Sequence, residues 1–208
     1  MSWTISKETL PYLHPASDAQ TQSNPAVPSL PVPQPPVLKE HETTAAFTGN
    51  FTIHFRPIRP EDESLLKDLF HSHSEQTILH RYFAPIHELS QEQIRRFVAI
   101  DYRRDFALVG LAPHEGAEKM ICVGRYYRNP ALNEAEVAIT VHDLFQGRGI
   151  GTYLAQTLVN VARQNGINAF RATILANNHA MMHVFHKVAQ KIAVESESGI
   201  YDLRFALT

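Results

Sequence analysis

The chain has 208 residues, of which 44% are hydrophobic and 19% are charged, enough for one well-buried domain or two very small ones. Nineteen Lys and Arg against twenty-one Asp and Glu give a net charge of −2, which argues against a nucleic-acid partner bound through charge alone. The single cysteine, Cys122, excludes an intramolecular disulfide framework and a multi-cysteine metal site. Neither a membrane-length apolar run nor a secretory signal is present, so we expect a cytoplasmic protein with no membrane partner.

Residues 1–48 differ in composition from the rest of the chain. They hold eight of the thirteen prolines and none of the nine glycines. Prolines between Pro25 and Pro36 fix φ and remove N–H donors, so neither a helix nor a sheet can grow there. We therefore predict a disordered, proline-rich leader over residues 1–48 and one domain over residues 49–208. Two PxxP matches leave open that the leader is a docking peptide rather than a tether.

The first elements of the domain are a strand and helices. Apolar and polar residues alternate over residues 51–55, which predicts a half-buried strand that Pro57 ends. Pro60, followed by acids, is typical of a helix first turn, and Ser74 begins a second short helical pattern. Ser90 and Gln93 have the spacing of a capping box that begins another helical stretch.

The second half of the chain alternates apolar runs with turn signals, which predicts an antiparallel meander followed by a β-α-β-α-β half. The expected order is β α α β β β α β α β β. This is an α+β fold with a mixed, mostly antiparallel, twisted sheet of about seven strands and about four flanking helices. The strands predicted after the first are 106–111, 120–127, 136–141, 169–175, 190–195 and 201–207, and the helices are 151–165 and 178–188.

A glycine-rich segment, Gln146-Gly147-Arg148-Gly149-Ile150-Gly151, lies between a predicted strand and a predicted helix. Successive backbone N–H groups there could converge on an anion at the positive end of the helix, which would make a diphosphate cradle. The spacing is neither that of a dinucleotide-binding fingerprint nor that of a P-loop. Arg148 could add charge or point to solvent. The alternative is a tight glycine turn that binds nothing.

The run from Glu136 to Gly151 resembles the GNAT superfamily of acetyl-CoA-dependent N-acetyltransferases. Its Gln/Arg-x-x-Gly-x-Gly/Ala signature is matched by Gln146, Gly149 and Gly151. The resemblance covers about residues 51–207. Upstream, residues 56–63 and 81–83 look most like the acetyltransferase domain of bacterial Pat-type protein lysine acetyltransferases.

The resemblance implies acetyl-CoA as co-substrate. The sequence has no His-Glu-x-x-His motif and one cysteine, so we expect no metal. Backbone amides of the glycine-rich segment would hold the diphosphate, and exposed main chain of the preceding strand would pair with the pantetheine arm. Asn178, which begins the last helix, would contact the pantetheine or cap its own helix, and the two roles are compatible. The implied cofactor-binding residues are Ile139, Thr140, Val141, Gln146, Gly147, Arg148, Gly149, Ile150, Gly151, Thr152 and Asn178.

Direct transfer to an amine requires a group that takes the amine's proton, because a lysine ammonium has an unperturbed pKa of about 10.4. Glu136 matches the position where Pat-like members keep a glutamate, so the resemblance makes it the expected catalytic base. Glu134 is the reserve, two residues earlier on the same face if the strand begins that early. The alternative for either residue is an ordinary solvated acid at a strand end.

The last helix departs from the family pattern in two places. Phe185 occupies the position of the tyrosine that often protonates the leaving thiolate, so water or His186 would have to serve. Val188-Ala189-Gln190 replaces the usual Leu-Gly-Phe, which restricts the backbone at the helix end. His179, His183 and His186 fall on one helical face, which suits a solvated surface better than a metal site.

The sequence therefore predicts an N-acetyltransferase that uses direct attack of an amine on acetyl-CoA, with a protein lysine as preferred acceptor. The alternatives are a small-molecule amine acceptor and a non-catalytic module that senses acyl-CoA. We expect the acceptor pocket to be built from residues 71–92 and the last two strands.

Overall fold

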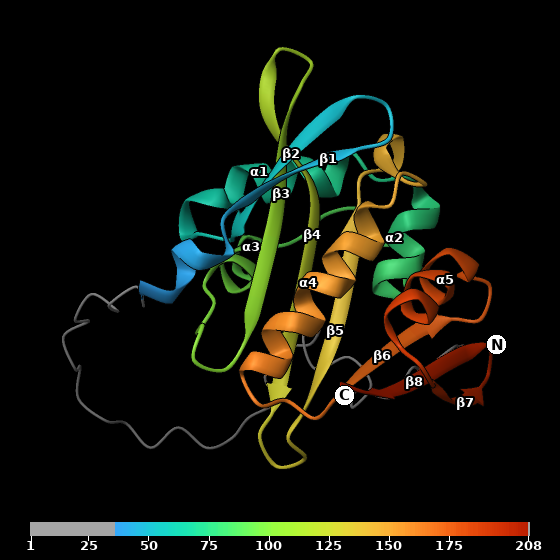
Figure 1. The fold of residues 1–208 in the computed structure, drawn as a ribbon. Helices are drawn as coiled ribbons and strands as arrows, with labels where there is room; N and C mark the ends of the chain where they lie inside the picture. The colour runs from blue at the N-terminus through green and yellow to red at the C-terminus, as the bar shows by residue number, and fades with distance from the viewer. Residues whose placement is uncertain (1–35, 208) are drawn as a thin grey trace, which may run out of the picture. The chain divides into compact units, whose positions relative to one another are not determined.

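The computed structural model describes residues 36–207. The part of the predicted leader before residue 36 lies outside this range. The eight strands are β1 (Thr43–Phe47), β2 (Phe51–Pro57), β3 (Phe106–His114), β4 (Ala117–Asn129), β5 (Glu134–Val141), β6 (Ala169–Leu175), β7 (Ala193–Glu197) and β8 (Ile200–Ala206). They form one sheet in the order β1-β2-β3-β4-β5-β6-β8-β7, and every pair is antiparallel except β5–β6. The mixed, mostly antiparallel α+β class is therefore confirmed (Figure 1).

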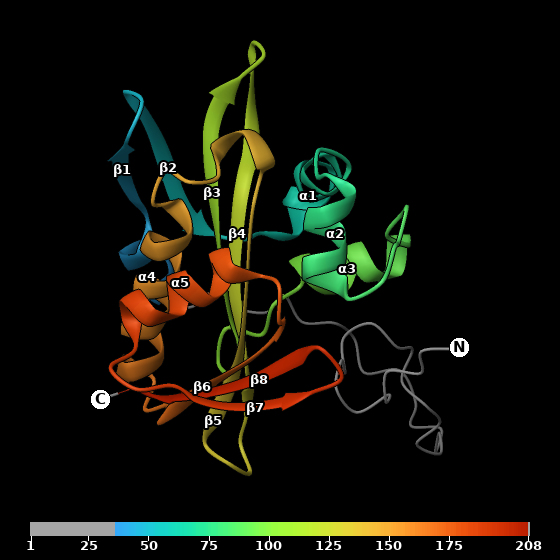
Figure 2. The same cartoon turned by 90° about the vertical axis from the view of Figure 1, so that its right-hand side faces the viewer.

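The helices divide between the two faces of the sheet. They are α1 (Glu63–His71), α2 (Glu75–Tyr82), α3 (Gln91–Val98), α4 (Ile150–Gln164) and α5 (His179–Val188). Figure 2 shows α1, α2 and α3 on one face and α4 and α5 on the other. Three helices rather than two follow β2, because the capping box at Ser90 forms and begins a helix of its own: the Ser90 hydroxyl accepts from Gln93 N–H at 3.2 Å. No helix within residues 36–207 is long and apolar enough to cross a membrane.

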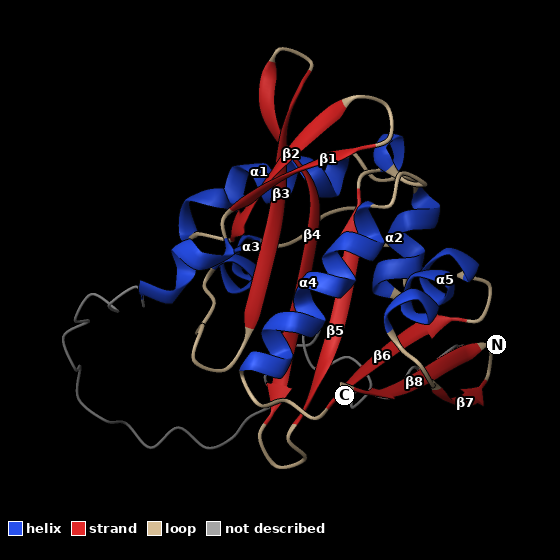
Figure 3. Ribbon diagram, in the orientation of Figure 1, coloured by secondary structure: helices blue, strands red, loops and turns tan. Residues whose placement is uncertain are grey.

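Strand β1 lies inside the segment predicted as leader, so the structure differs from the boundary placed after residue 48. The turn to β2 uses left-handed backbone at Gly49 and Asn50, with φ of 101° and 54°. The Phe47 ring packs at 5.9 Å from Phe55 and 5.6 Å from Tyr153. Phe47 is the one large apolar side chain of this strand, and so no alternation marks it in the sequence. Figure 3 shows β1 as a strand beside β2.

Strand β3 also continues beyond its predicted end at Ala112-Pro113. Pairing with β4 extends to His114, and Pro113 lies opposite Glu118. The pairing of β2 with β3 ends at Leu111, so the segment from Ala112 has a strand neighbour on one side only. Proline is tolerated at such an edge because its missing N–H is not needed for a second ladder.

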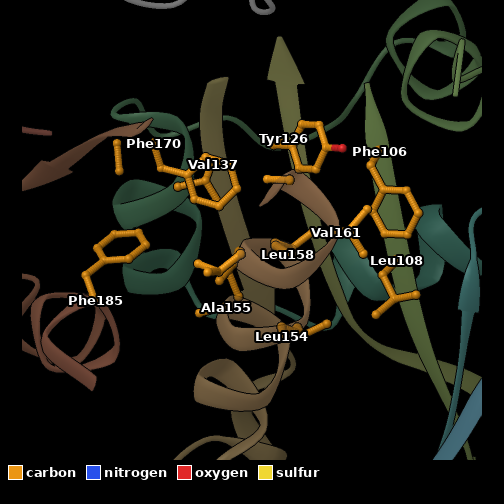
Figure 4. Close-up of a cluster of buried hydrophobic side chains, with 14 of the residues drawn as sticks. Phe106, Leu108, Tyr126, Val137, Leu154, Ala155, Leu158, Val161, Phe170 and Phe185 are labelled. Carbon is orange, nitrogen blue, oxygen red and sulfur yellow. The ribbon is translucent and has the colours of Figure 1, made fainter. Parts of the chain in front are cut away.

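The core on the α4 face explains the helical pattern of that segment. Leu154 and Leu158 are completely buried, and Val161 is 3% exposed, as their i, i+4, i+7 spacing predicts. Figure 4 shows these side chains reaching toward Val137 of β5 and the rings of Tyr126 and Phe170, among others. A second cluster joins α1 and α3 to the opposite face of the sheet. Strands β3 and β4 contribute side chains to both clusters and so lie between the helix layers.

Candidate active site

The sheet opens between β5 and β6. The two parallel strands pair only where residues 134–136 face residues 169–171. Beyond this point β6 continues in register with β8, and β5 continues in register with β4. Figure 1 shows the two strands diverging. The edge of β5 from Val137 to Val141 is therefore left without a strand partner on the β6 side.

The alternation of hydrogen bonds between β4 and β5 shows which main-chain groups of β5 face this opening. The N–H of His142 donates to the Ile121 carbonyl at 2.8 Å. Along an antiparallel pair the residues alternate between facing the neighbouring strand and facing away. Thr140 therefore directs its peptide groups to β4, whereas Ile139 and Val141 direct theirs to the open edge. Of these three residues with expected cofactor contacts, Ile139 and Val141 present main chain to the opening, and Thr140 does not.

Two glycines shape the turn before α4. Gly147 and Gly149 have φ of 73° and 88°, and a Cβ on either would meet no atom within 4 Å. The need for glycine at both positions is therefore conformational, since other L-residues rarely adopt a left-handed backbone. Open space beside both α-carbons also lets a ligand approach the main chain closely.

The start of α4 has unpaired backbone donors. Its N-cap is Gly149, which has no side chain to accept from the helix. The N–H groups of Ile150, Gly151 and Thr152 belong to the first turn, where no intrahelical carbonyl is available. Gly151 is favoured for a different reason, because a Cβ there would make a tight contact of 3.3 Å with Val184 of α5. The turn and the helix start together form an anion-binding geometry.

The Arg148 side chain is turned away from this turn. Its Nη2 donates to the Leu144 carbonyl at 3.1 Å. Its guanidinium carbon lies 5.1 Å from the Phe51 ring centre and 5.5 Å from that of Phe145. The structure thus places this half-buried charge against two aromatic rings and outside the cradle. Only the main chain of Arg148 remains for the expected cofactor contact.

A polar contact that the sequence did not reveal connects the cradle to α2. Asp143 accepts from the N–H and hydroxyl of Ser74 at 3.0 and 2.8 Å and from the Thr77 hydroxyl at 2.7 Å. Gln146 Nε2 donates to the Val141 carbonyl at 2.9 Å and lies 3.3 Å from the Thr77 hydroxyl. The cradle loop and the start of α2 are therefore held together.

Two ion pairs fix Glu134 at the end of β5 that is paired with β6. Its carboxylate accepts from Arg171 Nε at 2.6 Å and lies 2.7 Å from Arg204 Nη2. Burial by itself raises the pKa of Glu134, but hydrogen bonds from the two arginines outweigh it, and the net pKa lies below its ordinary value. A carboxylate held in this way is a weak proton acceptor. This geometry favours a structural role rather than the reserve base expected from the sequence.

Glu136 lies on the same face of β5, at the last position paired with β6. Burial raises the pKa of Glu136, the charge of Arg81 lowers it, and the charge of Asp202 raises it, with a net upward shift. No ion pair within 4 Å involves Glu136 in the described part of the chain. A desolvated carboxylate with a raised pKa is a better proton acceptor than Glu134. The structure thus separates two glutamates that the sequence placed on one face.

Helix α5 shows how the departures from the family pattern are accommodated. Asn178 caps the helix, because its Oδ1 accepts from Met181 N–H at 3.1 Å. Phe185 is 2% exposed, and its ring lies 5.4 Å from that of Phe205 in the core. The helix ends at Ala189 with φ of −116° and ψ of 132°, extended backbone that any residue adopts. The missing glycine therefore causes no strain.

The remaining candidate metal ligands are dispersed. His179, His183 and His186 are exposed on α5. Cys122 is completely buried, and burial raises the pKa of its thiol. Within residues 36–207 no three His, Cys, Asp or Glu side chains are grouped closely enough to hold a metal ion.

Comparison with known proteins agrees with this geometry. The sequence pattern of the acetyltransferase (GNAT) domain matches residues 52–189. The acetyltransferase PA5475 of Pseudomonas aeruginosa is 30% identical over 126 residues, which are 61% of this chain and 68% of that protein. The acetyltransferase Pat of Mycolicibacterium smegmatis is 32% identical over 156 residues, 74% of this chain but 45% of Pat. The solved GNAT domain of S. lividans PAT superposes with a TM-score of 0.70 at 29% identity, covering 80% of this chain and 97% of that domain. The chain belongs to the GNAT acetyltransferase family.

Proposed function

We propose that this chain is an acetyl-CoA-dependent N-acetyltransferase in which an amine attacks the thioester directly, with a protein lysine as preferred acceptor. The observation that carries the proposal is the position of Glu136. This desolvated carboxylate lies where β5 separates from β6, on the strand that leads directly into the glycine cradle.

The residues of the cradle and of β5 fit acetyl-CoA. The co-substrate supplies a diphosphate, an extended pantetheine arm with amide groups, and a reactive thioester. The N–H groups of residues 147–152 would hold the diphosphate, since the start of α4 has no side-chain cap. The main chain of Ile139 and Val141 would pair with the pantetheine amides as an added strand does. Asn178 would stay the cap of α5 beside this arm.

Glu136 would act on the acceptor. An amine attacks only when uncharged, so the carboxylate of Glu136 takes a proton from the ammonium and releases the lone pair for attack. Burial favours the protonated form of Glu136, which strengthens the carboxylate as a base. Glu134 would hold Arg171 and Arg204 in place and leave proton transfer to its neighbour. Because Phe185 is in the core, protonation of the leaving thiolate falls to water or to the exposed His186.

The protein-lysine acceptor is supported by the relatives. The family pattern alone does not select one amine, but Pat of Mycolicibacterium smegmatis and the GNAT domain of S. lividans PAT are both similar to this chain. The upstream segments of this chain at residues 56–63 and 81–83 also resemble the acetyltransferase domain of the Pat-type proteins. Protein lysine is therefore the acceptor to test first.

The test follows thiol release from acetyl-CoA with a panel of lysine-bearing proteins and small amines, and mass spectrometry identifies the acetylated atom. We expect release that depends on added protein lysine. Turnover with a polyamine, amino acid or aminoglycoside but with no protein would overturn the protein acceptor. Tight acetyl-CoA binding without turnover on any acceptor would identify an acyl-CoA-sensing module instead.

A further inference from the structure

A second polar feature lies beside Glu136, in a pocket between the α1–α3 layer and strands β4 and β5. Its apolar lining consists of leucine and phenylalanine side chains from α1 and α3 and of Val123. Its polar lining residues are His73, Arg81, Tyr82, Arg125 and Thr140. None of the lining residues is acidic, so the pocket carries two arginines without an internal counter-charge.

Arg125 is the most deeply placed of these cations, with 3% of its surface exposed. Its Nη1 donates to the Phe97 carbonyl at 3.1 Å and to the Tyr127 hydroxyl at 3.0 Å. Its guanidinium carbon lies 5.0 Å from the centre of the Phe97 ring. No ion pair within residues 36–207 involves Arg125. The bond to the Phe97 carbonyl ties Arg125 to the end of α3. Burying the charge of Arg125 among neutral partners alone still costs desolvation free energy.

Arg81 and His73 line the same pocket from the two ends of α2, His73 just before the helix and Arg81 in its last turn. The guanidinium carbon of Arg81 lies 5.2 Å from the centre of the Tyr82 ring, and no ion pair of the described chain includes it. The His73 side chain is 3% exposed, and its Nδ1 has no hydrogen-bond partner although Asp143 Oδ2 is 3.6 Å away. Burial is the main cause that lowers the pKa of His73 to about 4. The pocket thus holds an orphaned imidazole nitrogen next to two unpaired cations.

The pocket adjoins the proposed base. Thr140, which lines it, projects from the same face of β5 as Glu136. Arg125 lies opposite Ala138, between these two residues in the β4–β5 register. The charge of Arg81 acts on both His73 and Glu136. The two β5 residues beside the pocket, Ala138 and Thr140, are therefore two and four positions from Glu136, about 7 and 14 Å along the strand.

We propose that this pocket binds a carboxylate of the acceptor, held by Arg81 and Arg125 while the acceptor's amine meets Glu136. This inference rests on the proposed acetyl transfer and defines its substrate class: amines that carry a carboxylate in the same molecule. In a protein acceptor the carboxylate is that of an Asp or Glu next to the lysine. In a small acceptor it is the carboxylate of an amino acid.

Paired acceptors test the inference kinetically. One pair is a lysine peptide with Glu beside the lysine and the same peptide with Gln there, and the other pair is free lysine and lysinamide. We expect kcat/KM to be roughly tenfold to a hundredfold higher for the carboxylate member of at least one pair, as for charge-assisted hydrogen bonds. The pair that shows the difference identifies the source of the carboxylate. Equal kcat/KM within both pairs would overturn the proposal.

Substitutions show which arginine causes the preference for the carboxylate-bearing acceptor. Arg81→Gln is expected to abolish the difference within the pair. Because the charge of Arg81 also lowers the pKa of Glu136, the quantity compared is the ratio of kcat/KM between the two members, not the rate with either one. Arg96→Gln removes the same charge from an exposed position of α3 and should keep the difference. A preference that survives Arg81→Gln would contradict the assignment. Arg125→Lys, with the buried charge retained, provides a second variant if Arg125→Gln fails to fold.

A binding measurement separates this inference from the proposed function. The full chain is titrated with the same four compounds in the absence of acetyl-CoA, and the imidazole resonances of His73 are followed by NMR, with His73→Gln for assignment. Carboxylate members should shift these resonances, and their neutral counterparts should not. Shifts without any turnover would retain the pocket and remove the acetyl transfer. Turnover without selective shifts would retain the acetyl transfer and remove the carboxylate pocket.

Discussion

The two ends of β5 differ in how the chain uses them. At the first end, residues 134–136 have strand partners on both sides, and the available groups are side chains, namely the carboxylates of Glu134 and Glu136. At the second end, residues 137–141 pair with β4 only, and the available groups are main-chain N–H and C=O. Gly147 and Gly149, just beyond this end, extend the same main-chain surface.

The difference shows how one strand can serve two ligands. A side-chain site needs its carboxylates held by neighbours, which the paired end provides through Arg171, Arg204 and the burial of Glu136. A main-chain site needs unpaired backbone, which is available only where the sheet opens. Changes at the first end should therefore alter chemistry or stability, and changes at the second should alter cofactor affinity.

The largest effect is expected from Glu136→Gln. Loss of the proton acceptor should reduce kcat by about 10²- to 10⁴-fold, the usual contribution of a positioned base. The affinity for acetyl-CoA should stay within about twofold, because that binding depends on the other end of β5. Steady-state kinetics and calorimetric titration with acetyl-CoA measure the two quantities. An unchanged kcat would remove Glu136 from the mechanism.

The pH dependence of the same variant gives an independent check. Only the deprotonated form of Glu136 accepts a proton, so the wild-type rate should rise with pH through the raised pKa, and this limb should be absent in Glu136→Gln. A raised folded-state pKa also means that ionisation opposes folding above the unfolded pKa. Glu136→Gln should therefore be more stable than wild type at pH 7. Glu195→Gln, on the exposed strand β7, is the matched control.

The sequence predicted most of the second half of the fold because its signals are local. The buried run 169–175 is a strand with the predicted bounds, and the helix predicted over residues 151–165 is α4, Ile150–Gln164. Strand β1 was missed because it is specified by pairing with β2 and by the packing of Phe47, which no local period reports.

The candidate site divides in the same way. The glycine turn is visible in the sequence because left-handed backbone selects glycine at fixed spacing. No local pattern marks Arg125 and His73 as buried, since their burial results from tertiary packing. The hydrogen bond that Ser74 donates to Asp143 joins residues 69 positions apart, so it too is decided by the fold. The different roles of Glu134 and Glu136 follow from Arg171 and Arg204, which approach from other strands.

A substitution at the second end of β5 should affect binding rather than chemistry. Gly149→Val places a side chain on a residue with φ of 88°, where a Cβ meets no atom of the protein but would occupy the space beside the cradle. We expect acetyl-CoA affinity to fall at least tenfold, with a stability loss of about 1–2 kcal/mol from the left-handed backbone. Gly166→Val is the control, because Gly166 has φ of 70° and equal space after the opposite end of α4. It should lose similar stability and keep its affinity, and equal affinity losses would reject the cradle.

Phe185→Tyr restores the tyrosine that often protonates the leaving thiolate. It tests whether a hydroxyl at this position can reach the site or is buried in the core. The ring is in contact with Phe205 in the core, so an added hydroxyl would be buried without a partner. We expect the free energy of unfolding to fall by about 1–3 kcal/mol, without a gain in kcat. Thermal unfolding and steady-state kinetics check both outcomes. A faster variant with unchanged stability would show that the ring reaches the thiolate.

The smallest effect is expected from Glu134→Gln, which separates the two carboxylates of the first end. Arg171 and Arg204 are half-exposed, so losing their partner should lower the free energy of unfolding by about 1 kcal/mol, and kcat should change by less than about threefold. The lowered pKa of Glu134 means that its contribution is present above the unfolded pKa and is lost as the pH falls. The stability difference between wild type and variant should therefore be full at pH 7 and shrink below about pH 4. A loss of kcat as large as that of Glu136→Gln would show that proton transfer is shared along the strand, and the distinction between a structural and a catalytic glutamate would fail.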